Sequence, residues 1–377
     1  MSLQNKLFHR PYIGVEDVVA RINGVVGGPA KLHSPLLGEE ETRAVSECVR
    51  GGNVTHGPQL EKFENDLALR LRAKNVVAVS SGTAALHLAL LVAGVGRGDS
   101  VAMPAFTFVA TANAVKYCGA VPNFIDCDEY GGLSPEKLDS WLKTHKVKAV
   151  VCVHAFGHPC DMTGLLEVCN RYSVPLIEDA AQALGSWHGS THAGTFGLLG
   201  TFSFNGNKII TTGGGGGVVT SEKKLAERVR SLASTSKIDV PHEFWHAEVG
   251  FNYRMPNINA ALGLAQVSRL YDILSRKRAL AKKYQEAFSD CIYAGMMGAK
   301  YMGNNWLNAV VLHESVPKEA RYDIVNKLSS EGIECRLSWT PLNLLSMYKD
   351  SPRDDLSMTF NLASRIINVP SGPGLTP

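Results

Sequence analysis

The stretch GTFSFNGNKIITTGGGGGVVT, residues 200–220 of the 377-residue chain, holds one lysine between an apolar run and five glycines. The apolar run, residues 201–204, reads as β-rich; the lysine is Lys208, and the glycines occupy positions 213–217. Glycines let the backbone approach a ligand closely or bend where a side chain would clash. A lysine amine held away from water there has a lowered pKa and attacks carbonyl groups, which is Schiff-base chemistry. A solvated surface lysine beside a flexible loop is the alternative interpretation.

A second segment, VPLIEDAAQAL (residues 174–184), has two acids at the end of an apolar run. Residues 174–177 predict a short buried strand, and Glu178 and Asp179 follow at its carboxyl edge. Ligands of open α/β sheets bind beyond the carboxyl ends of the strands, so an acid there is predicted to face a ligand crevice. The alternative is that Asp179 caps a helix that follows it.

A third segment, VVAVSSGTAALHLALLVAG (residues 76–94), predicts a strand, a turn of small residues and then an apolar helix. The free N–H groups at the start of that helix, with the hydroxyls of Ser81 and Thr83 nearby, would suit a phosphate group. The segment lacks the patterns G-x-G-x-x-G and G-x-x-x-x-G-K-[ST]. That absence argues against a Rossmann dinucleotide site and a P-loop.

Together these segments supply what pyridoxal 5'-phosphate (PLP) requires: a phosphate site, a carboxylate for the pyridine nitrogen and a lysine for a Schiff base. Their order, SSGTAAL then IEDAAQAL then SFNGNK, resembles the fold-type I PLP-dependent enzymes. More narrowly, it resembles the nucleotide-sugar aminotransferases of the DegT/DnrJ/EryC1/StrS family. The resemblance extends over most of the chain, through NVTHGPQLEKFE (53–64), PAFTFVATANAV (104–115), HAFGHPCDM (154–162), HAGTFGLLGTFSFNGNKIITTGGGGG (192–217) and GFNYRMPNINAALG (250–263).

The resemblance implies catalytic and ring-binding roles for four residues. Lys208 matches the lysine that binds PLP through a Schiff base and then moves a proton between the cofactor and the sugar. Asp179 matches the acid paired with the pyridine nitrogen, and Gln182 matches a residue beside the ring. Phe108 matches the aromatic ring that stacks on the pyridine. Some members with histidine in place of this lysine catalyse dehydration, so the lysine favours transamination.

The same resemblance implies the phosphate contacts and the oligomeric state. Gly82, Thr83 and Ser203 match residues that bind the phosphate of PLP. Asn252 matches a residue that reaches the phosphate in the other subunit. The family pattern therefore implies a homodimer with shared active sites and PLP as its cofactor.

Within the family, the chain resembles enzymes that aminate C4 of a UDP-4-keto-6-deoxy-N-acetylhexosamine, as in legionaminic-acid biosynthesis. The segments that carry this narrower resemblance are FGHPC (156–160), FNGNKIITTGGGG (204–216), EFWHAEVGFNYRMPNINAALG (243–263) and NNWLNAVVL (304–312). The implied reaction uses glutamate as amino donor in the biosynthesis of bacterial surface-glycan sugars. Amination at C3, another nucleotide-sugar PLP enzyme and a PLP-binding sensor without turnover stay open as alternatives.

The order of predicted elements indicates the fold class. Strands are expected at 76–79, 100–103, 121–125, 147–153 and 174–177, and helices at 39–50, 107–117, 134–145 and 162–171. This alternation predicts an α/β fold with a mostly parallel sheet covered by helices on both faces. The resemblance adds the fold-type I, aspartate aminotransferase-like architecture. The expected division is 1–256 for an N-terminal segment and the large PLP-binding domain, and 257–377 for a long bridging helix, through about residue 288, and a small C-terminal α/β domain.

Composition argues against other classes of protein. With 45% hydrophobic and 19% charged residues, a chain of this length can bury a large core. The net charge of +3 is too small to indicate nucleic-acid binding, and the longest apolar stretch, 84–95, is too short to span a bilayer. The N-terminus lacks the apolar core of a signal peptide, and the eight cysteines form no C-x-x-C pair. A cytoplasmic protein with reduced thiols is therefore expected.

One motif points to a different class. His242, Glu243 and His246 fit H-E-x-x-H, the pattern in which two histidines on one face of a helix bind zinc in metalloproteases. Pro241 and Gly250 would confine such a helix to about two turns. No third ligand stands at a suitable spacing, so we expect no metal site here.

Overall fold

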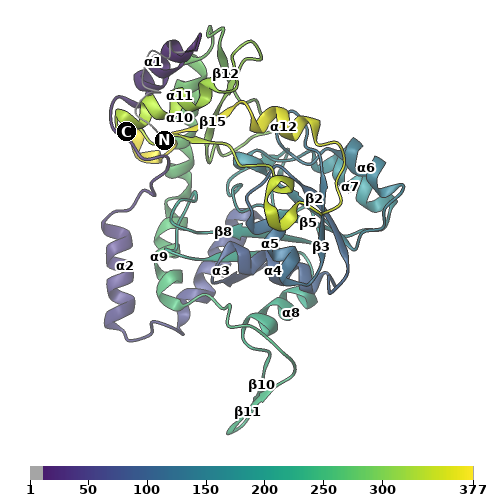
Figure 1. The fold of residues 1–377 in the computed structure, drawn as a ribbon. Coiled ribbons are helices and arrows are strands. Elements are labelled where there is room, and N and C mark those ends of the chain that lie inside the picture. The colour runs from purple at the N-terminus through teal and green to yellow at the C-terminus, as the bar shows by residue number, and fades with distance from the viewer. Residues whose placement is uncertain (1–11, 377) are drawn as a thin grey trace, which may run out of the picture.

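The computed structural model describes residues 12–376, and its central element is a seven-stranded sheet (Figure 1). The strand order is β1-β9-β8-β5-β4-β2-β3. Strand β9 is antiparallel to both of its neighbours, and the other neighbouring strands are parallel. The structure therefore confirms an α/β fold with a mostly parallel sheet. The strands are β1 Asn75–Val79, β2 Ser100–Pro104, β3 Val121–Ile125, β4 Ala149–Val153, β5 Leu176–Asp179, β8 Leu199–Ser203 and β9 Gly216–Thr220.

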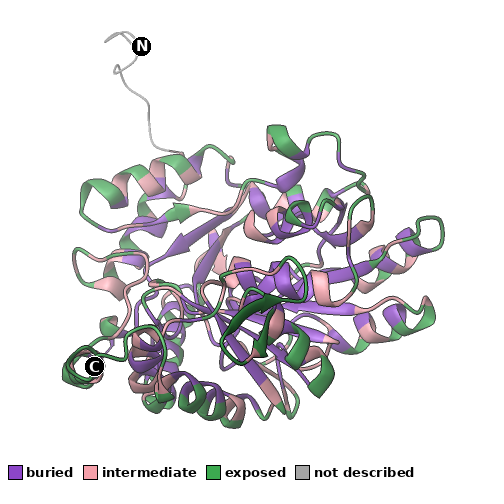
Figure 2. Cartoon of the chain, turned by 90° about the horizontal axis from the view of Figure 1, so that it is seen from below, coloured by how far each residue is buried: buried purple, intermediate pink, exposed green. Residues whose placement is uncertain are grey.

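Helices cover both faces of this sheet, as the sequence predicts. Val77 and Val79 of β1 belong to one apolar core, whereas Val76 and Ala78 belong to another. Successive side chains of a strand point to opposite faces, so these cores lie on opposite sides of the sheet. In Figure 2 the buried strands lie at the centre and exposed residues on the outer sides of the helices. The covering helices are α3 Pro58–Leu71, α4 Gly82–Val92, α5 Ala110–Tyr117, α6 Pro135–Leu142, α7 Met162–Arg171 and α8 Lys223–Ala233.

A second, antiparallel sheet of four strands forms nearer the C-terminus, in the order β12-β13-β15-β14. Helices α10 and α11 and the N-terminal helix α1 pack with it around a separate apolar core (Figure 1). The predicted domain boundary at residue 256 stays a prediction. The elements are α1 Val15–Val26, α10 Leu270–Ala287, β12 Ala294–Met296, β13 Asn308–Leu312, α11 Ala320–Ser330, β14 Arg336–Leu337 and β15 Ile366–Val369.

The remaining elements are short or peripheral. No helix between residues 12 and 376 combines the length and the apolar character needed to cross a bilayer. The short strands are β6 Trp187–His188, β7 Thr191–His192, β10 Lys237–Val240 and β11 Glu243–His246. The other helices are α2 Glu39–Arg50, α9 Asn257–Ser268, α12 Ser357–Ala363 and the 3-10 turns Ala155–Gly157, Leu342–Leu344, Ser346–Tyr348 and Pro373–Leu375.

The predicted long helix over residues 257–288 is two helices, so that expectation was wrong. Helices α9 and α10 meet at Arg269, where the backbone leaves the helical conformation with φ −95° and ψ 3°. The guanidinium of Arg269 donates to the Glu41 carboxylate of α2 at 3.1 Å, and Gln266 donates to the same carboxylate at 2.7 Å. The break therefore coincides with tertiary contacts to α2, which a local sequence pattern does not reveal.

The zinc-protease alternative is wrong because its helix does not form. Residues 237–246 form the exposed hairpin β10–β11, which extends away from the body of the chain (Figure 1). His242 lies in the turn with a left-handed φ of 66°, and His246 is in β11. The two histidines therefore do not share a helix face. Between residues 12 and 376, no cluster of three His, Cys, Asp or Glu side chains could hold a metal ion.

Candidate active site

A cavity of about 300 Å³ lies at the carboxyl ends of β5 and β8, beside the N-terminus of α4. This is the edge at which open α/β sheets bind ligands. The cavity brings together seven of the eight residues that the sequence assigned to PLP, although their roles stay predictions. They are Gly82, Thr83, Phe108, Asp179, Gln182, Ser203 and Lys208.

Lys208 follows β8 in a turn closed by its own N–H, which donates to the Asn205 carbonyl at 3.0 Å. Its side chain is half-buried, and Nζ lies 4.0 Å from the centre of the Trp306 ring. Loss of water lowers the pKa of Lys208 to about 8, against the opposing effect of Asp179. A larger share of this amine is therefore neutral, and so nucleophilic, at physiological pH than of an ordinary lysine.

Asp179 is the last residue of β5 and is buried. Its Oδ2 accepts a hydrogen bond from the Thr111 hydroxyl at 2.7 Å, and its Oδ1 accepts one from the Ala181 N–H at 3.1 Å. Burial raises the pKa of this carboxyl, while these bonds and the nearby Lys208 oppose the rise. No helix begins between residues 180 and 198, so the capping interpretation of Asp179 was wrong.

The end of the cavity nearest α4 is lined by small residues and hydroxyl groups. The Ser81 side chain caps α4 by accepting from the Ala84 N–H at 3.1 Å, which fixes where the helix begins. A Cβ at Gly82 would lie 2.7 Å from Cβ of Ser203, and one at Gly216 would lie 2.4 Å from the Ser81 carbonyl oxygen. Only glycine fits these positions, and the backbone N–H groups at the helix start stay open to an anion.

Phe108 and Gln182 also line the cavity. Phe108 is 56% exposed, so its ring is free to cover a planar ligand. Gln182 is buried, and its side-chain oxygen accepts from the Phe156 N–H at 2.7 Å. This bond fixes the orientation of the Gln182 amide beside the site.

Asn252 lies outside the cavity, exposed, and its backbone forms an isolated bridge to Ser234. Its expected contact with the other subunit's phosphate therefore stays a prediction.

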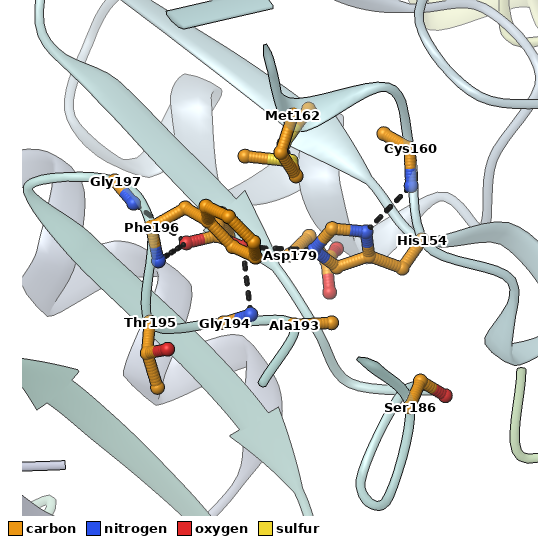
Figure 3. Close-up of polar contacts among 12 residues, drawn as sticks. His154, Cys160, Met162, Asp179, Ser186, Ala193, Gly194, Thr195, Phe196 and Gly197 are labelled. Atoms are coloured by element: carbon orange, nitrogen blue, oxygen red, sulfur yellow. Dashed lines mark hydrogen bonds and ion pairs between the residues drawn. The ribbon is translucent and has the colours of Figure 1, made fainter. Parts of the chain in front are cut away.

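The two acids of the IED segment differ in what they face. The buried Glu178 carboxylate accepts from the N–H groups of Gly194, Phe196 and Gly197 at 2.6 to 2.7 Å. It also bonds His154 Nε2 at 3.0 Å. Figure 3 labels His154 and the loop residues of this network. Neighbouring residues of a strand point to opposite sides, so Glu178 anchors the 194–197 loop and only Asp179 lines the cavity.

Sequence reasoning gave no individual role to several residues that line the site, among them Thr111, Trp306 and Trp339. All three line the cavity, and the Thr111 hydroxyl donates a hydrogen bond to Asp179. Trp339 stacks on Phe156 with ring centres 4.6 Å apart. Thr111 lies in the TFVATA segment and Trp306 in NNWLN, two stretches already singled out, but their contacts depend on the tertiary fold.

The residues present fit PLP. The cavity combines an amine of lowered pKa, a buried carboxyl group at a strand end and an uncluttered helix N-terminus with three hydroxyl groups. Lys208 would bind the aldehyde carbon of PLP, and Asp179 would pair with the pyridine nitrogen. The phosphate would lie at the end of the cavity lined by Ser81, Thr83 and Ser203.

Comparison with known proteins agrees with this geometry. The model of the DegT/DnrJ/EryC1/StrS aminotransferase family matches residues 35–377. The chain is 37% identical over 347 residues to a GDP-perosamine synthase of Escherichia coli O157:H7, with 92% of this chain and 94% of that protein covered. It is 38% identical over 358 residues to a Bacillus subtilis (strain 168) protein named as a pyridoxal phosphate-dependent aminotransferase, EpsN, with 92% and 91% covered. The solved structure of Helicobacter pylori PseC, an aminotransferase involved in the biosynthesis of pseudoaminic acid, superposes with a TM-score of 0.85 at 25% identity, covering 91% and 93%.

Proposed function

Since this chain belongs to the DegT/DnrJ/EryC1/StrS aminotransferase family, we propose that it aminates C4 of a UDP-linked 4-keto-6-deoxy-N-acetylhexosamine, with glutamate as amino donor. At the coarser level it is a PLP-dependent sugar aminotransferase of nucleotide-sugar biosynthesis. The observation behind the residue assignment is that Lys208 and Asp179 line one cavity with an anion-binding helix N-terminus. The product would serve bacterial surface-glycan synthesis.

Each cavity residue has a different role in the proposed transamination. PLP, when bound, supplies an electron sink at the carbon that loses or gains a proton. Lys208 holds the cofactor and then moves a proton at Nζ to and from that carbon, for which its pKa of about 8 is well suited. Asp179 keeps a proton on the ring nitrogen, and Thr111 holds Asp179 in place. Phe108 excludes water from one face of the ring.

A second cavity supports a substrate larger than an amino acid. It has a volume of about 480 Å³ and shares four lining residues with the first: Phe108, Asn207, Trp306 and Trp339. Its other lining residues include the polar side chains of His33 and Asn368 and the ion pair of Arg336 with Glu334 at 2.9 Å. The guanidinium of Arg336 has further N–H groups that suit a diphosphate. We therefore place the sugar at the junction of the two cavities and the nucleotide in the second.

The nucleotide and the aminated carbon can be tested together. UDP- and GDP-linked 4-keto-6-deoxy sugars and a 3-keto analogue would be supplied with glutamate, and the product carbon bearing nitrogen read by NMR. We expect the highest kcat/KM with the UDP-linked N-acetyl sugar and nitrogen at C4. The GDP-linked sugar is the second candidate because relatives are named GDP-perosamine synthases. Preference for GDP would overturn the UDP assignment, and nitrogen at C3 would overturn the C4 assignment.

The charges in the cavity support a homodimer with shared sites. Lys208 is the one cationic side chain lining the cavity among residues 12–376, and the covalent link to PLP would engage it. The phosphate dianion thus lacks a cationic side chain of its own chain to compensate its charge. Asn252 and Arg254 are exposed on one segment, and we propose that this segment of a second copy completes the site.

Mixing two inactive variants tests this arrangement. Lys208→Ala removes the amine, and Asn252→Asp places a negative charge beside the phosphate of the other copy. Heterodimers formed by co-expressing the two variants should contain one intact site and regain activity that neither variant has alone. If the mixture is no more active than its separate components, the sites are not shared.

A further inference from the structure

Lys277 of α10 is a buried ammonium group that lines neither cavity. Its exposure is 1%, and its Nζ donates to the carbonyl of Ser371 at 2.5 Å and to that of Trp306 at 3.0 Å. The third partner is Nε2 of His33 at 3.2 Å. These acceptors come from the C-terminal segment, the loop before β13 and the segment before α2. One charged group therefore joins three distant parts of the chain.

A positive charge at this position is costly, because none of the contacts of Lys277 within residues 12–376 is with an ionised group of opposite charge. The partners of Lys277 in the described part of the chain are two carbonyls and an imidazole, all neutral. Burial lowers the pKa of Lys277 to about 7, and burial together with Lys277 lowers the pKa of His33 to about 2. A methionine of similar size would fill this space without the desolvation penalty, but it would leave the carbonyls of Trp306 and Ser371 without their donor. Packing alone does not account for a lysine here.

The residue that Lys277 holds is the one that covers the proposed catalytic amine. The Trp306 N–H donates to Asn304 Oδ1 at 2.8 Å, and its indole Nε1 donates to the carbonyl of Asn207 at 2.6 Å. Asn207 directly precedes Lys208, whose Nζ lies 4.0 Å from the indole centre. Trp306 is thus fixed at its N–H, its carbonyl and its indole, and the ring rests on Lys208.

We propose that Lys277 is a positioning residue for Lys208 and acts through Trp306. The proposal rests on the proposed role of Lys208 as the PLP-binding residue. Without the ammonium, the Trp306 carbonyl loses its donor and the loop before β13 is free to shift. The indole then leaves the amine, water reaches Nζ, and the pKa of Lys208 returns towards that of an ordinary lysine.

The test is the pH dependence of PLP capture by the apo-protein, measured by absorbance, because only the neutral amine reacts. The wild-type midpoint should lie at about 8. Lys277→Met should raise it by roughly one pH unit. Asp179 and His33, the titratable groups that interact with Lys208, are present in every variant. Lys282→Met changes an exposed lysine of the same helix and should leave the midpoint unchanged.

A double variant distinguishes positioning from a general loss of stability or a direct effect of charge. In a Trp306→Ala background, Lys277→Met should cause no further shift of the midpoint. No shift in the single variant, or the same shift in both backgrounds, overturns the proposal. If Lys277→Met does not fold, Trp306→Ala alone decides, and an unchanged midpoint rejects the role of the indole. Borohydride reduction and mass analysis of wild type separate the two proposals: PLP fixed elsewhere than Lys208 refutes the proposed function.

Discussion

Lys208→Ala is expected to lose turnover by at least about 10³-fold while the protein stays folded. In the proposed mechanism its amine both holds PLP and moves the proton, so one substitution would remove both functions. The cavity keeps its carboxyl group and its phosphate end, so the variant should still bind PLP without a covalent bond. Single-turnover assays with glutamate would measure the chemical step, and gel filtration in the presence of PLP would measure retention of the cofactor.

A matched lysine serves as the control. Lys223→Ala removes a lysine whose side chain is 83% exposed, at the start of α8, and should leave turnover unchanged. Borohydride should fix the mass of reduced PLP to Lys208 in wild type and to no peptide of Lys208→Ala. Turnover of the variant at the wild-type rate would refute the mechanism.

The cofactor end of the site could be predicted from sequence because its residues occupy short contiguous segments. Each segment joins a strand end to a turn, and parallel strands bring their carboxyl ends to one edge of the sheet. Asp179 and Lys208, 29 positions apart in the sequence, therefore meet in one cavity. The five glycines likewise signal close backbone approach without knowledge of the neighbour that requires it.

What could not be predicted depends on tertiary contacts. Nothing in the residues around Thr111 indicates a hydroxyl that bonds an aspartate 68 positions later. Glu178 and Asp179 have different roles because the backbone of the 194–197 loop donates hydrogen bonds to Glu178 and not to Asp179. A five-residue motif such as that from His242 to His246 needs a helix, and the local chain forms a hairpin instead. The identity of the substrate is harder to predict from the sequence, because residues from both ends of the chain line the second cavity.

Asp179→Asn is expected to keep the fold and to lower kcat by about 10²- to 10³-fold. Asparagine has the shape of aspartate: its carbonyl oxygen can accept from the Ala181 N–H, and its NH₂ can donate to the Thr111 hydroxyl, so the strand end should stay in place. It carries no charge, however, and it cannot hold a proton on the ring nitrogen of PLP. Without that proton the cofactor is a weaker electron sink, and proton transfer at the substrate carbon slows while substrate binding changes little.

The neighbouring acid makes the test specific. Glu178→Gln also removes one negative charge from the end of β5, but Glu178 accepts three backbone N–H groups and faces away from the cavity. An amide NH₂ placed against one of these N–H groups should lower the free energy of unfolding by about 1–3 kcal/mol. The folded fraction of Glu178→Gln should turn over near the wild-type rate, whereas Asp179→Asn should melt near the wild-type temperature with kcat reduced. Because the two changes remove the same charge one residue apart, a shared effect on kcat would mean that net charge matters, not the pairing of Asp179 with the ring nitrogen.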